Sequence, residues 1–264
     1  MYTLMKAEAL AQLAGLQQEI SRLHQFARQD QTHFSLLECR FSRLQAFNHQ
    51  PQLQPYRPRL ESDEAVTAQI AQLRDVANAA LCDYEKHRVC ALCSQPAQSN
   101  AYLSSFDRAL QLEIAQAGIK PGEQVLLVGS GALPTTAVAL VTKLAATVFC
   151  YDCDPAAQQL ARRLIRHLGL EQQIQCIDSL EVLGHRVDHI IVASLVADKQ
   201  TLLPQLSRCL AKDGKLLMRY GNGLKSIFNY PYHHQIAGTH WRAVGKPVTT
   251  PLYDLMILES HRHE

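Results

Sequence analysis

A short glycine turn, followed about twenty residues later by an acid, gives this chain a set of residues able to bind a nucleoside. An apolar run over 125–128 ends in Gly129-Ser-Gly131, and a second apolar run over 147–150 leads to Asp152. Glycines let the backbone approach a ligand closely, and an aspartate at this place can accept hydrogen bonds from ribose hydroxyls. The pattern predicts binding of a cofactor that contains adenosine. The alternative is a tight strand-to-helix turn that binds nothing.

The third glycine of the dinucleotide fingerprint is missing, because Leu133-Pro134 stands in its place. That glycine allows the close helix packing on which a bound pyrophosphate depends. Its absence argues against NAD and FAD. It suits S-adenosylmethionine, which carries no phosphate, and Pro134 is compatible with a first helical turn.

Alternating apolar segments from Gly118 onward predict the elements that position these residues. Strand and helix patterns that alternate are typical of a parallel, doubly wound sheet, in which ligands lie at the carboxyl ends of the strands. We expect strands at 124–128, 147–151, 173–177, 188–193, 214–219 and 253–258, with helices at 134–145, 155–168 and 199–211.

Residues 1–117 carry helical spacing and no strand signal. Helices are expected up to residue 47, over 62–93 and over 100–118, with a polar, proline-rich linker at 48–58. The sequence therefore predicts an α/β protein in two domains. These are an N-terminal all-helical domain, 1–117, forming a lid and acceptor site, and a Rossmann-like methyltransferase-type domain, 118–264.

The bulk properties exclude several classes of protein. The 264 residues carry a formal net charge of +2 with no basic run, so nucleic acid is not an expected partner. No apolar stretch is long enough to cross a membrane, and the N-terminus reads as an amphipathic helix, not as a signal peptide. We expect a cytoplasmic protein with reduced cysteines. The pairs Cys90/Cys93 and Cys150/Cys153 have zinc-like spacing, but we expect buried, inert thiols and no metal.

Several segments resemble the nicotianamine synthases and their bacterial relatives, the aminobutanoyltransferases of opine metallophore biosynthesis. The matching segments are VGSGALPTTAVAL, YDCDPAAQQLARRL and IIVASLVADKQTLLPQLSRCLAKDGKLLMRYGNGLKSIFNYP, with LCDYEKH and SNAYLSSFDRALQLE upstream. Together they cover most of residues 80–231, whereas residues 1–60 show no resemblance. A generic methyltransferase is not expected to match the long third segment.

The resemblance implies transfer of the 3-amino-3-carboxypropyl (aminobutyrate) arm of S-adenosylmethionine to an amine, with release of methylthioadenosine. Amines are largely protonated at neutral pH, so a base must remove a proton before the nitrogen attacks. By position, Glu85 matches the catalytic glutamate of the family and Tyr102 its catalytic tyrosine. From the sequence alone, Glu85 would be assigned to the solvated face of a long helix and Tyr102 to packing.

The remaining site residues follow from the same resemblance. Asp178 would face adenine or cap a helix, and Arg219 would pair with a carboxylate of the arm or the acceptor, or form an ordinary ion pair. The cofactor would contact Gly129, Ser130, Gly131, Asp152, Asp178, Ser194 and Leu195, and the substrate Arg219 and Tyr220.

Two departures from the plant enzymes point to a single transfer onto a separate amino acid. The stretch between Glu85 and Tyr102 is shorter, and Tyr220 replaces a small serine. We expect histidine as the acceptor, with a weak preference for the L form, and a homodimer. The resemblance also implies a downstream opine dehydrogenase as a pathway partner. The alternatives are a conventional small-molecule methyltransferase, a nicotianamine synthase proper, and a non-catalytic cofactor sensor.

Overall fold

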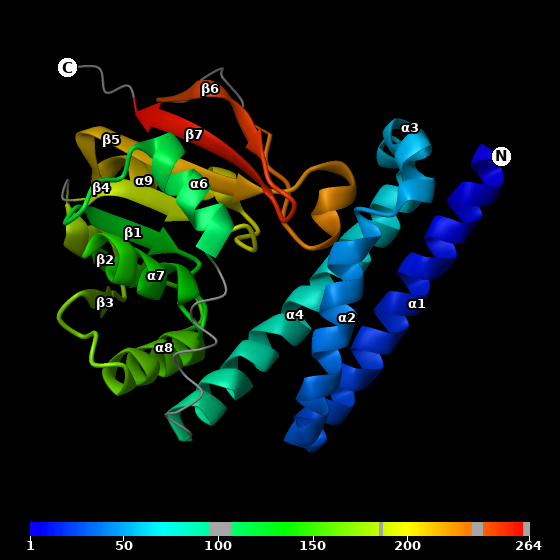
Figure 1. Ribbon diagram of the computed structural model, residues 1–264, viewed down its shortest axis with the longest axis horizontal. Coiled ribbons are helices and arrows are strands. Elements are labelled where there is room, and N and C mark those ends of the chain that lie inside the picture. The colour runs from blue at the N-terminus through cyan, green and yellow to red at the C-terminus, as the bar shows by residue number, and fades with distance from the viewer. Residues whose placement is uncertain (95–106, 185–186, 234–239, 261–264) are drawn as a thin grey trace. The chain divides into compact units, whose positions relative to one another are not determined.

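The computed structural model describes residues 1–94, 107–184, 187–233 and 240–260 (Figure 1). Two compact units make up the chain. The helical unit comprises residues 1–87 and 220–231, and the sheet unit comprises residues 88–219 and 232–264. The predicted boundary after residue 117 falls inside the sheet unit, because Leu110 and Ala117 belong to the hydrophobic core around the first strand.

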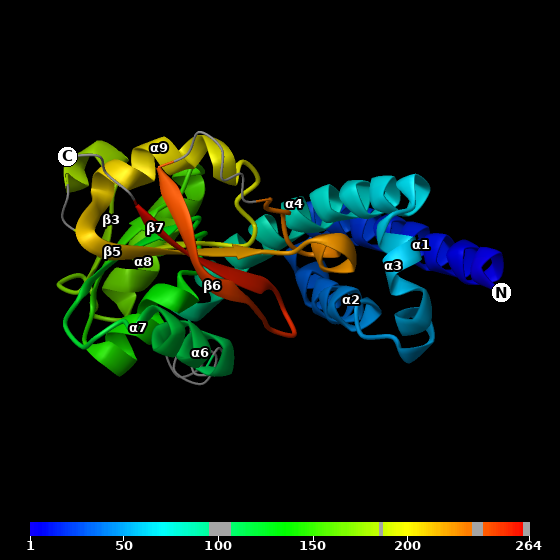
Figure 2. The same cartoon turned by 90° about the horizontal axis from the view of Figure 1, so that it is seen from above.

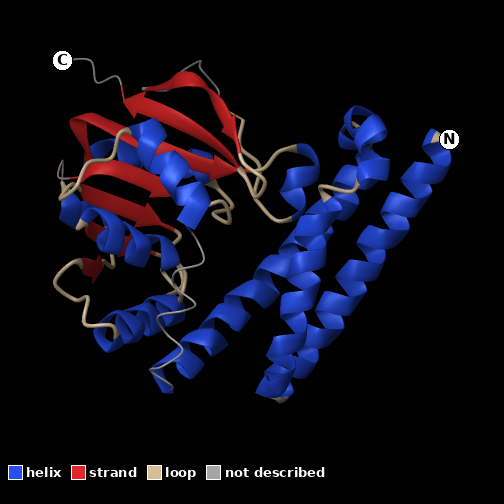
Figure 3. Ribbon diagram, viewed as in Figure 1, coloured by secondary structure: helices blue, strands red, loops and turns tan. Residues whose placement is uncertain are grey.

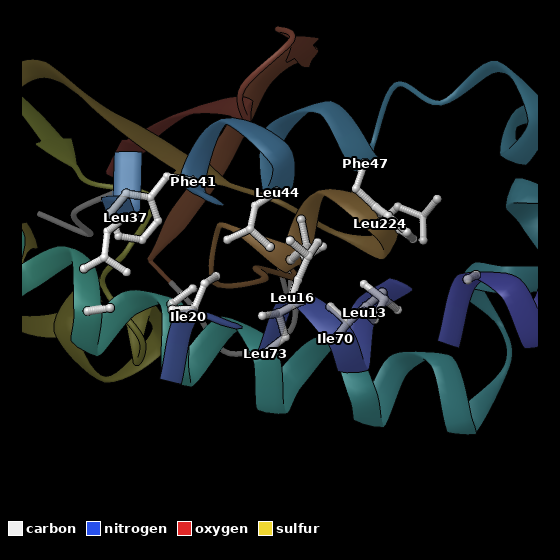
Figure 4. Packing of buried hydrophobic residues seen from close by; sticks show 14 of the residues in the cluster. Leu13, Leu16, Ile20, Leu37, Phe41, Leu44, Phe47, Ile70, Leu73 and Leu224 are labelled. Atoms are coloured by element: carbon white, nitrogen blue, oxygen red, sulfur yellow. The ribbon is translucent and has the colours of Figure 1, made fainter. Parts of the chain in front are cut away.

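The helical unit is built on three long helices (Figure 3). They are α1 (Tyr2–Gln29), α2 (Phe34–Phe47) and α4 (Glu64–Ser94), whose last turns belong to the sheet unit. Each presents an apolar stripe at helical spacing, which it buries against the others. Figure 4 shows Leu13, Leu16 and Ile20 of α1 facing Leu37 and Leu44 of α2 and Ile70 and Leu73 of α4.

The proline-rich segment after α2 is not the open linker that the sequence predicts. It forms a 3₁₀ helix, Pro51–Tyr56, followed directly by α3 (Arg57–Glu61). Proline is tolerated in the first turn of a helix, where its missing N–H has no helical partner. Leu53 and Leu60 are fully buried, so the segment contributes to the core of the unit.

A segment from much later in the chain completes the helical unit. Its 3₁₀ helix, Gly223–Ile227, places Leu224 and Ile227 in the same core. Glu61 accepts a hydrogen bond from the backbone N–H of Leu224 at 3.0 Å. Gly223 has φ 58°, and a Cβ there would lie 2.3 Å from the Glu61 carboxylate. This position therefore requires glycine.

The sheet unit holds a seven-stranded sheet in the order β3-β2-β1-β4-β5-β7-β6. The predicted parallel part consists of five strands, β1 (Gln124–Val128), β2 (Thr147–Tyr151), β3 (Ile174–Cys176), β4 (Val187–Val192) and β5 (Leu210–Tyr220). Neighbouring strands in this part pair in parallel, as predicted. The last strand, β7 (Asp254–Ser260), is also close to its predicted range.

Helices cover both faces of the sheet, which confirms the doubly wound α/β fold. Figure 2 shows α9 (Lys199–Cys209) on one face and α6 (Asp107–Ala117) and α7 (Thr135–Leu144) on the other. The core beneath α6, α7 and α8 (Pro155–His167) uses alternate residues of the strands, such as Val125 and Leu127 of β1.

One strand, β6 (Trp241–Thr249), was not predicted. It pairs antiparallel with β7 and forms an edge of the sheet. Gly245 has φ 72°, Pro247 follows, and the pairing register shifts between Val244 and Val248. Such an irregularity is compatible with an edge strand, although glycine and proline weaken the sequence signal for a strand.

Candidate active site

The predicted glycine turn follows β1 directly and leads into α7. Gly129 has φ 76° and Gly131 has φ 64°, conformations that favour glycine. The backbone N–H groups of Gly129 and Ser130 donate to the carbonyl oxygen of Tyr151 at 2.8 and 3.3 Å. These two bonds tie the turn to the end of β2, so the carboxyl ends of the first two strands form one continuous surface.

Asp152 joins the two loops at this edge. Its Oδ2 accepts from the N–H of Gly131 at 2.8 Å, and its Oδ1 accepts from the N–H of Asp154 at 2.9 Å. Each carboxylate oxygen has a further lone pair, so the group can still accept hydrogen bonds from a ligand. Asp154 caps α8 through a bond from the N–H of Ala156, as its position before Pro155 predicts.

A pocket of about 380 Å³ opens beside this aspartate. Arg162 of α8 donates to the Asp178 carboxylate at 2.6 Å across it, and to the carbonyl oxygen of Cys176 at 3.3 Å. The lining therefore offers both acceptors and one guanidinium. It consists of Tyr151, Asp152, Cys153, Pro155, Gln158, Gln159, Arg162 and Asp178.

The loop after β4 lies against the glycine turn. A Cβ on Gly129 would meet Cγ2 of Val196 at 2.5 Å, so the Val196 side chain packs against the backbone of the turn as closely as glycine allows. Ser194 and Leu195 are half-buried in this loop. The structure thus brings the predicted cofactor residues of β1, β2 and β4 to one edge of the sheet.

Arg219, at the end of β5, is held in a buried ion pair. Its Nε and Nη2 donate to Oε1 and Oε2 of Glu113 at 2.8 and 2.6 Å, and Nη1 donates to Thr136 Oγ1 at 3.1 Å. The Tyr253 hydroxyl donates to the same Glu113 at 2.6 Å. This geometry favours the ion-pair alternative for Arg219 over a substrate carboxylate, because the guanidinium is already bidentate with Glu113.

Burial and the charge of Glu113 together set the pKa values in this network. Glu113 is fully buried and Arg219 nearly so. Burial disfavours the charged guanidinium, yet the Glu113 carboxylate outweighs it and raises the pKa of Arg219. Burial also raises the pKa of Tyr253, so its hydroxyl stays protonated and serves as a donor.

Comparison with known proteins identifies the family. The family model described as "Nicotianamine synthase protein" matches residues 4–262. This chain belongs to that family. A Yersinia pestis protein named L-histidine 2-aminobutanoyltransferase is 68% identical over 264 residues, which is 100% of both chains. A Pseudomonas aeruginosa protein of the same name is 35% identical over 95% of this chain and 96% of its own.

Solved structures support the fold. A crystal structure of a mutant of MtNAS covers 94% of this chain and 97% of its own, with a TM-score of 0.73 and 17% identity. The same mutant in complex with S-adenosylmethionine also has a TM-score of 0.73, and covers 92% and 97%. Nicotianamine synthase family members thus share the arrangement of a helical N-terminal region and a sheet.

The structure describes one of the two predicted catalytic residues, Glu85. Glu85 lies on α4 in the helical unit and is half-buried, next to the buried Tyr84. Two residues earlier on the helix, Asp83 pairs with Nε2 of His24 at 2.9 Å. Tyr102 lies outside the described residues. Tyr220 is buried and belongs to the helical unit.

Sequence reasoning missed Glu113, although a signal was present. Leu110, Glu113 and Ala117 share one face of α6, and the two apolar residues are in the core. An acid on the core-facing side of an amphipathic helix needs a buried cationic partner. No comparable pattern in the sequence indicates a role for Arg162 or a buried position for Lys199.

The cysteines are less uniformly buried than the sequence predicts. Cys150 is buried, whereas Cys90 and Cys153 are exposed and Cys93 is half-buried. Cys150 lies in β2 and belongs to the core of the sheet unit. Its hydrogen bond to Cys176, together with burial, raises the pKa of the Cys150 thiol. Within the described ranges, no group of three or more His, Cys, Asp or Glu residues could hold a metal ion.

Proposed function

We propose that this protein transfers the 3-amino-3-carboxypropyl group of S-adenosylmethionine to the α-amine of L-histidine and releases methylthioadenosine. The observation that carries the proposal is the 68% sequence identity, over the full length of both chains, to the Yersinia pestis L-histidine 2-aminobutanoyltransferase. The more distant Pseudomonas aeruginosa relative bears the same name. Both names specify the L form, in agreement with the weak sequence preference.

The residues at the sheet edge fit S-adenosylmethionine. Gly129 and Gly131 leave room for the methionine and ribose part, and Asp152 has lone pairs for the ribose hydroxyls. Asp178 and the pocket beside it would take the adenine, with Ser194 and Leu195 closing the opposite side. The sulfonium makes the adjacent carbon electrophilic, and the protein decides which carbon reacts by what it presents to the nucleophile.

Glu85 is the proposed base, or the carboxylate that orients the ammonium. It accepts a proton from the histidine ammonium, which frees the lone pair on the nitrogen. That lone pair then forms the new C–N bond as the C–S bond of the donor breaks. The electron pair of the broken bond goes to sulfur, which leaves as the neutral thioether methylthioadenosine. Tyr102 is the proposed hydrogen-bond partner of Glu85. Arg219 is assigned to the scaffold, not to the substrate.

The decisive experiment is mass spectrometry of the purified protein with S-adenosylmethionine and, in separate tubes, L- or D-histidine. Methylthioadenosine together with an adduct of L-histidine heavier by one aminobutyrate unit is the expected result. S-adenosylhomocysteine would place the protein among conventional methyltransferases. An adduct with D-histidine alone would overturn the stereochemical part of the proposal.

Glu85→Gln tests the proposed base. We expect the variant to bind S-adenosylmethionine normally and to form at least about 100-fold less product, as general-base catalysis contributes on this order. Glu64→Gln is the matched control, because Glu64 is exposed on the first turn of the same helix. Equal activity of the two variants would remove Glu85 from the mechanism.

Three further parts of the proposal concern the context of the reaction. The product carries amines and carboxylates, which bind late first-row divalent metals, so a metallophore pathway is the proposed context. The family resemblance alone suggests a downstream opine dehydrogenase as the pathway partner. A homodimer and a cytoplasmic location complete the proposal. No helix among the described residues is long and apolar enough to cross a membrane.

A further inference from the structure

A buried ammonium lies beneath the loop that follows β4. Lys199 is the first residue of α9, and its side chain is 1% exposed. Its Nζ donates to the carbonyl oxygens of Ser194, at 3.0 Å, and of Val196. Burying an ammonium is expensive unless it is hydrogen-bonded, and a cation at a helix N-terminus opposes the helix dipole. Lys199 is therefore poorly explained by the stability of α9 alone.

These two bonds fix the orientation of two peptide planes. In a trans peptide the N–H points opposite to the C=O, and the described chain has no cis peptide bonds. The Ser194 and Val196 carbonyls point toward Lys199, so the N–H groups of Leu195 and Ala197 point away from it. Neither N–H has a hydrogen-bond partner within the described part of the chain.

The same loop forms the wall next to the glycine turn. The N–H of Ala193 donates to the carbonyl of Val128 at 2.9 Å, and the N–H of Val196 donates back to Ala193 at 3.2 Å. Val196 then packs against Gly129, where no Cβ would fit. The loop is thus fixed at three points: to β1, to Gly129 and to the Lys199 ammonium.

We propose that Lys199 is a positioning residue that holds residues 194–197 so that the Leu195 and Ala197 N–H groups bind the carboxylate of the aminocarboxypropyl arm. This inference rests on the proposed function, because it assumes that the donor lies at this edge of the sheet. Two N–H groups that both point away from the Lys199 ammonium can donate to the two oxygens of one carboxylate. Lys199 does not touch the donor in this arrangement and acts through the loop.

Three ligands separate this role from a merely structural one. Decarboxylated S-adenosylmethionine lacks only the carboxylate, and methylthioadenosine lacks the whole arm. By calorimetry without histidine, wild-type protein is expected to bind S-adenosylmethionine about tenfold or more tightly than its decarboxylated form, as expected for hydrogen bonds to a charged group. Equal affinities for these two ligands would overturn the proposal. This test uses the wild-type protein alone.

Lys199→Met then assigns the effect to the lysine. The variant is expected to bind S-adenosylmethionine about tenfold more weakly, while its affinity for the decarboxylated form and for methylthioadenosine changes less than about twofold. A loss of all three affinities together would mean a general role in folding and would overturn the proposal. Lys212→Met, the same change at an exposed lysine of the sheet unit, is the control.

Lys199→Gln covers the case in which the methionine variant fails to fold. Its amide retains N–H donors and should restore part of the selectivity for the carboxylate. These assays measure binding alone, so they remain informative if the transfer reaction itself is not observed. A wild-type protein that binds the donor selectively yet forms no histidine adduct would contradict the proposed function and leave the role of Lys199 intact.

Discussion

Glu113→Gln is expected to destabilise the sheet unit strongly, because it leaves the Arg219 guanidinium buried without its counter-charge. Both Arg219–Glu113 hydrogen bonds are short, at 2.8 and 2.6 Å, and Glu113 is fully buried. Removing one partner of such a pair costs about 3–5 kcal/mol. The Tyr253 hydroxyl also loses a charged acceptor.

The magnitude translates into a clear thermal shift. For chains of this size, 1 kcal/mol corresponds to about 2–4 °C, so the melting temperature should fall by roughly 6–20 °C. Glu259→Gln provides the matched control. Its carboxylate pairs with the largely exposed Arg242 at 3.0 Å, and an exposed pair contributes at most about 1 kcal/mol.

Thermal and urea unfolding of the two variants measure the difference. Pairing with Arg219→Met should recover much of the loss, because the double variant no longer buries a lone charge. Similar melting temperatures for the two glutamine variants would refute the reasoning. A stable Glu113→Gln protein with weakened donor binding would instead return Arg219 to the substrate role predicted from the sequence.

Two further substitutions test the site and the pH response. Gly129→Ala introduces a Cβ 2.5 Å from Cγ2 of Val196 at φ 76°, so the turn should leave this conformation in the free protein. Restoring the conformation on binding costs about 1–2 kcal/mol, so donor affinity by calorimetry should fall about tenfold. Unchanged affinity would contradict a close approach there. Burial lowers the pKa of His189, although the Glu123 carboxylate at 3.1 Å acts in the opposite direction. The unfolded state therefore binds more protons than the folded state, and the free energy of unfolding falls as the pH drops below the usual histidine pKa of about 6.5. His189→Gln should flatten this slope in urea unfolding between pH 7 and 5, and parallel slopes would exclude His189 as its source.

Much of the sheet could be predicted because its signals are local. The apolar runs of β1 and β2, each ending at a glycine or an acid, gave their bounds to the residue. β6 could not be predicted, since Gly245 and Pro247 interrupt its pattern and only its place at the sheet edge permits them. The 3₁₀ helix at Pro51–Tyr56 was hidden for a similar reason.

The candidate site likewise contains residues that local spacing predicts and residues that only the fold brings together. The glycine turn and Asp152 lie within one βαβ unit, so spacing alone predicts them. The Arg219–Glu113 pair joins residues 106 positions apart, and only the packed fold brings them together. The position of Lys199 is equally invisible, because nothing in its neighbours along the chain indicates a buried ammonium.

The segment 220–231 has a consequence for how the protein is made on the ribosome. Leu224 and Ile227 complete a core whose other members all precede residue 88. That core stays incomplete while roughly 140 more residues are synthesised, which takes about 7–28 s at ordinary elongation rates. The helical unit is therefore not a detachable module, and an expression fragment ending before Leu224 would carry an exposed apolar surface prone to aggregation.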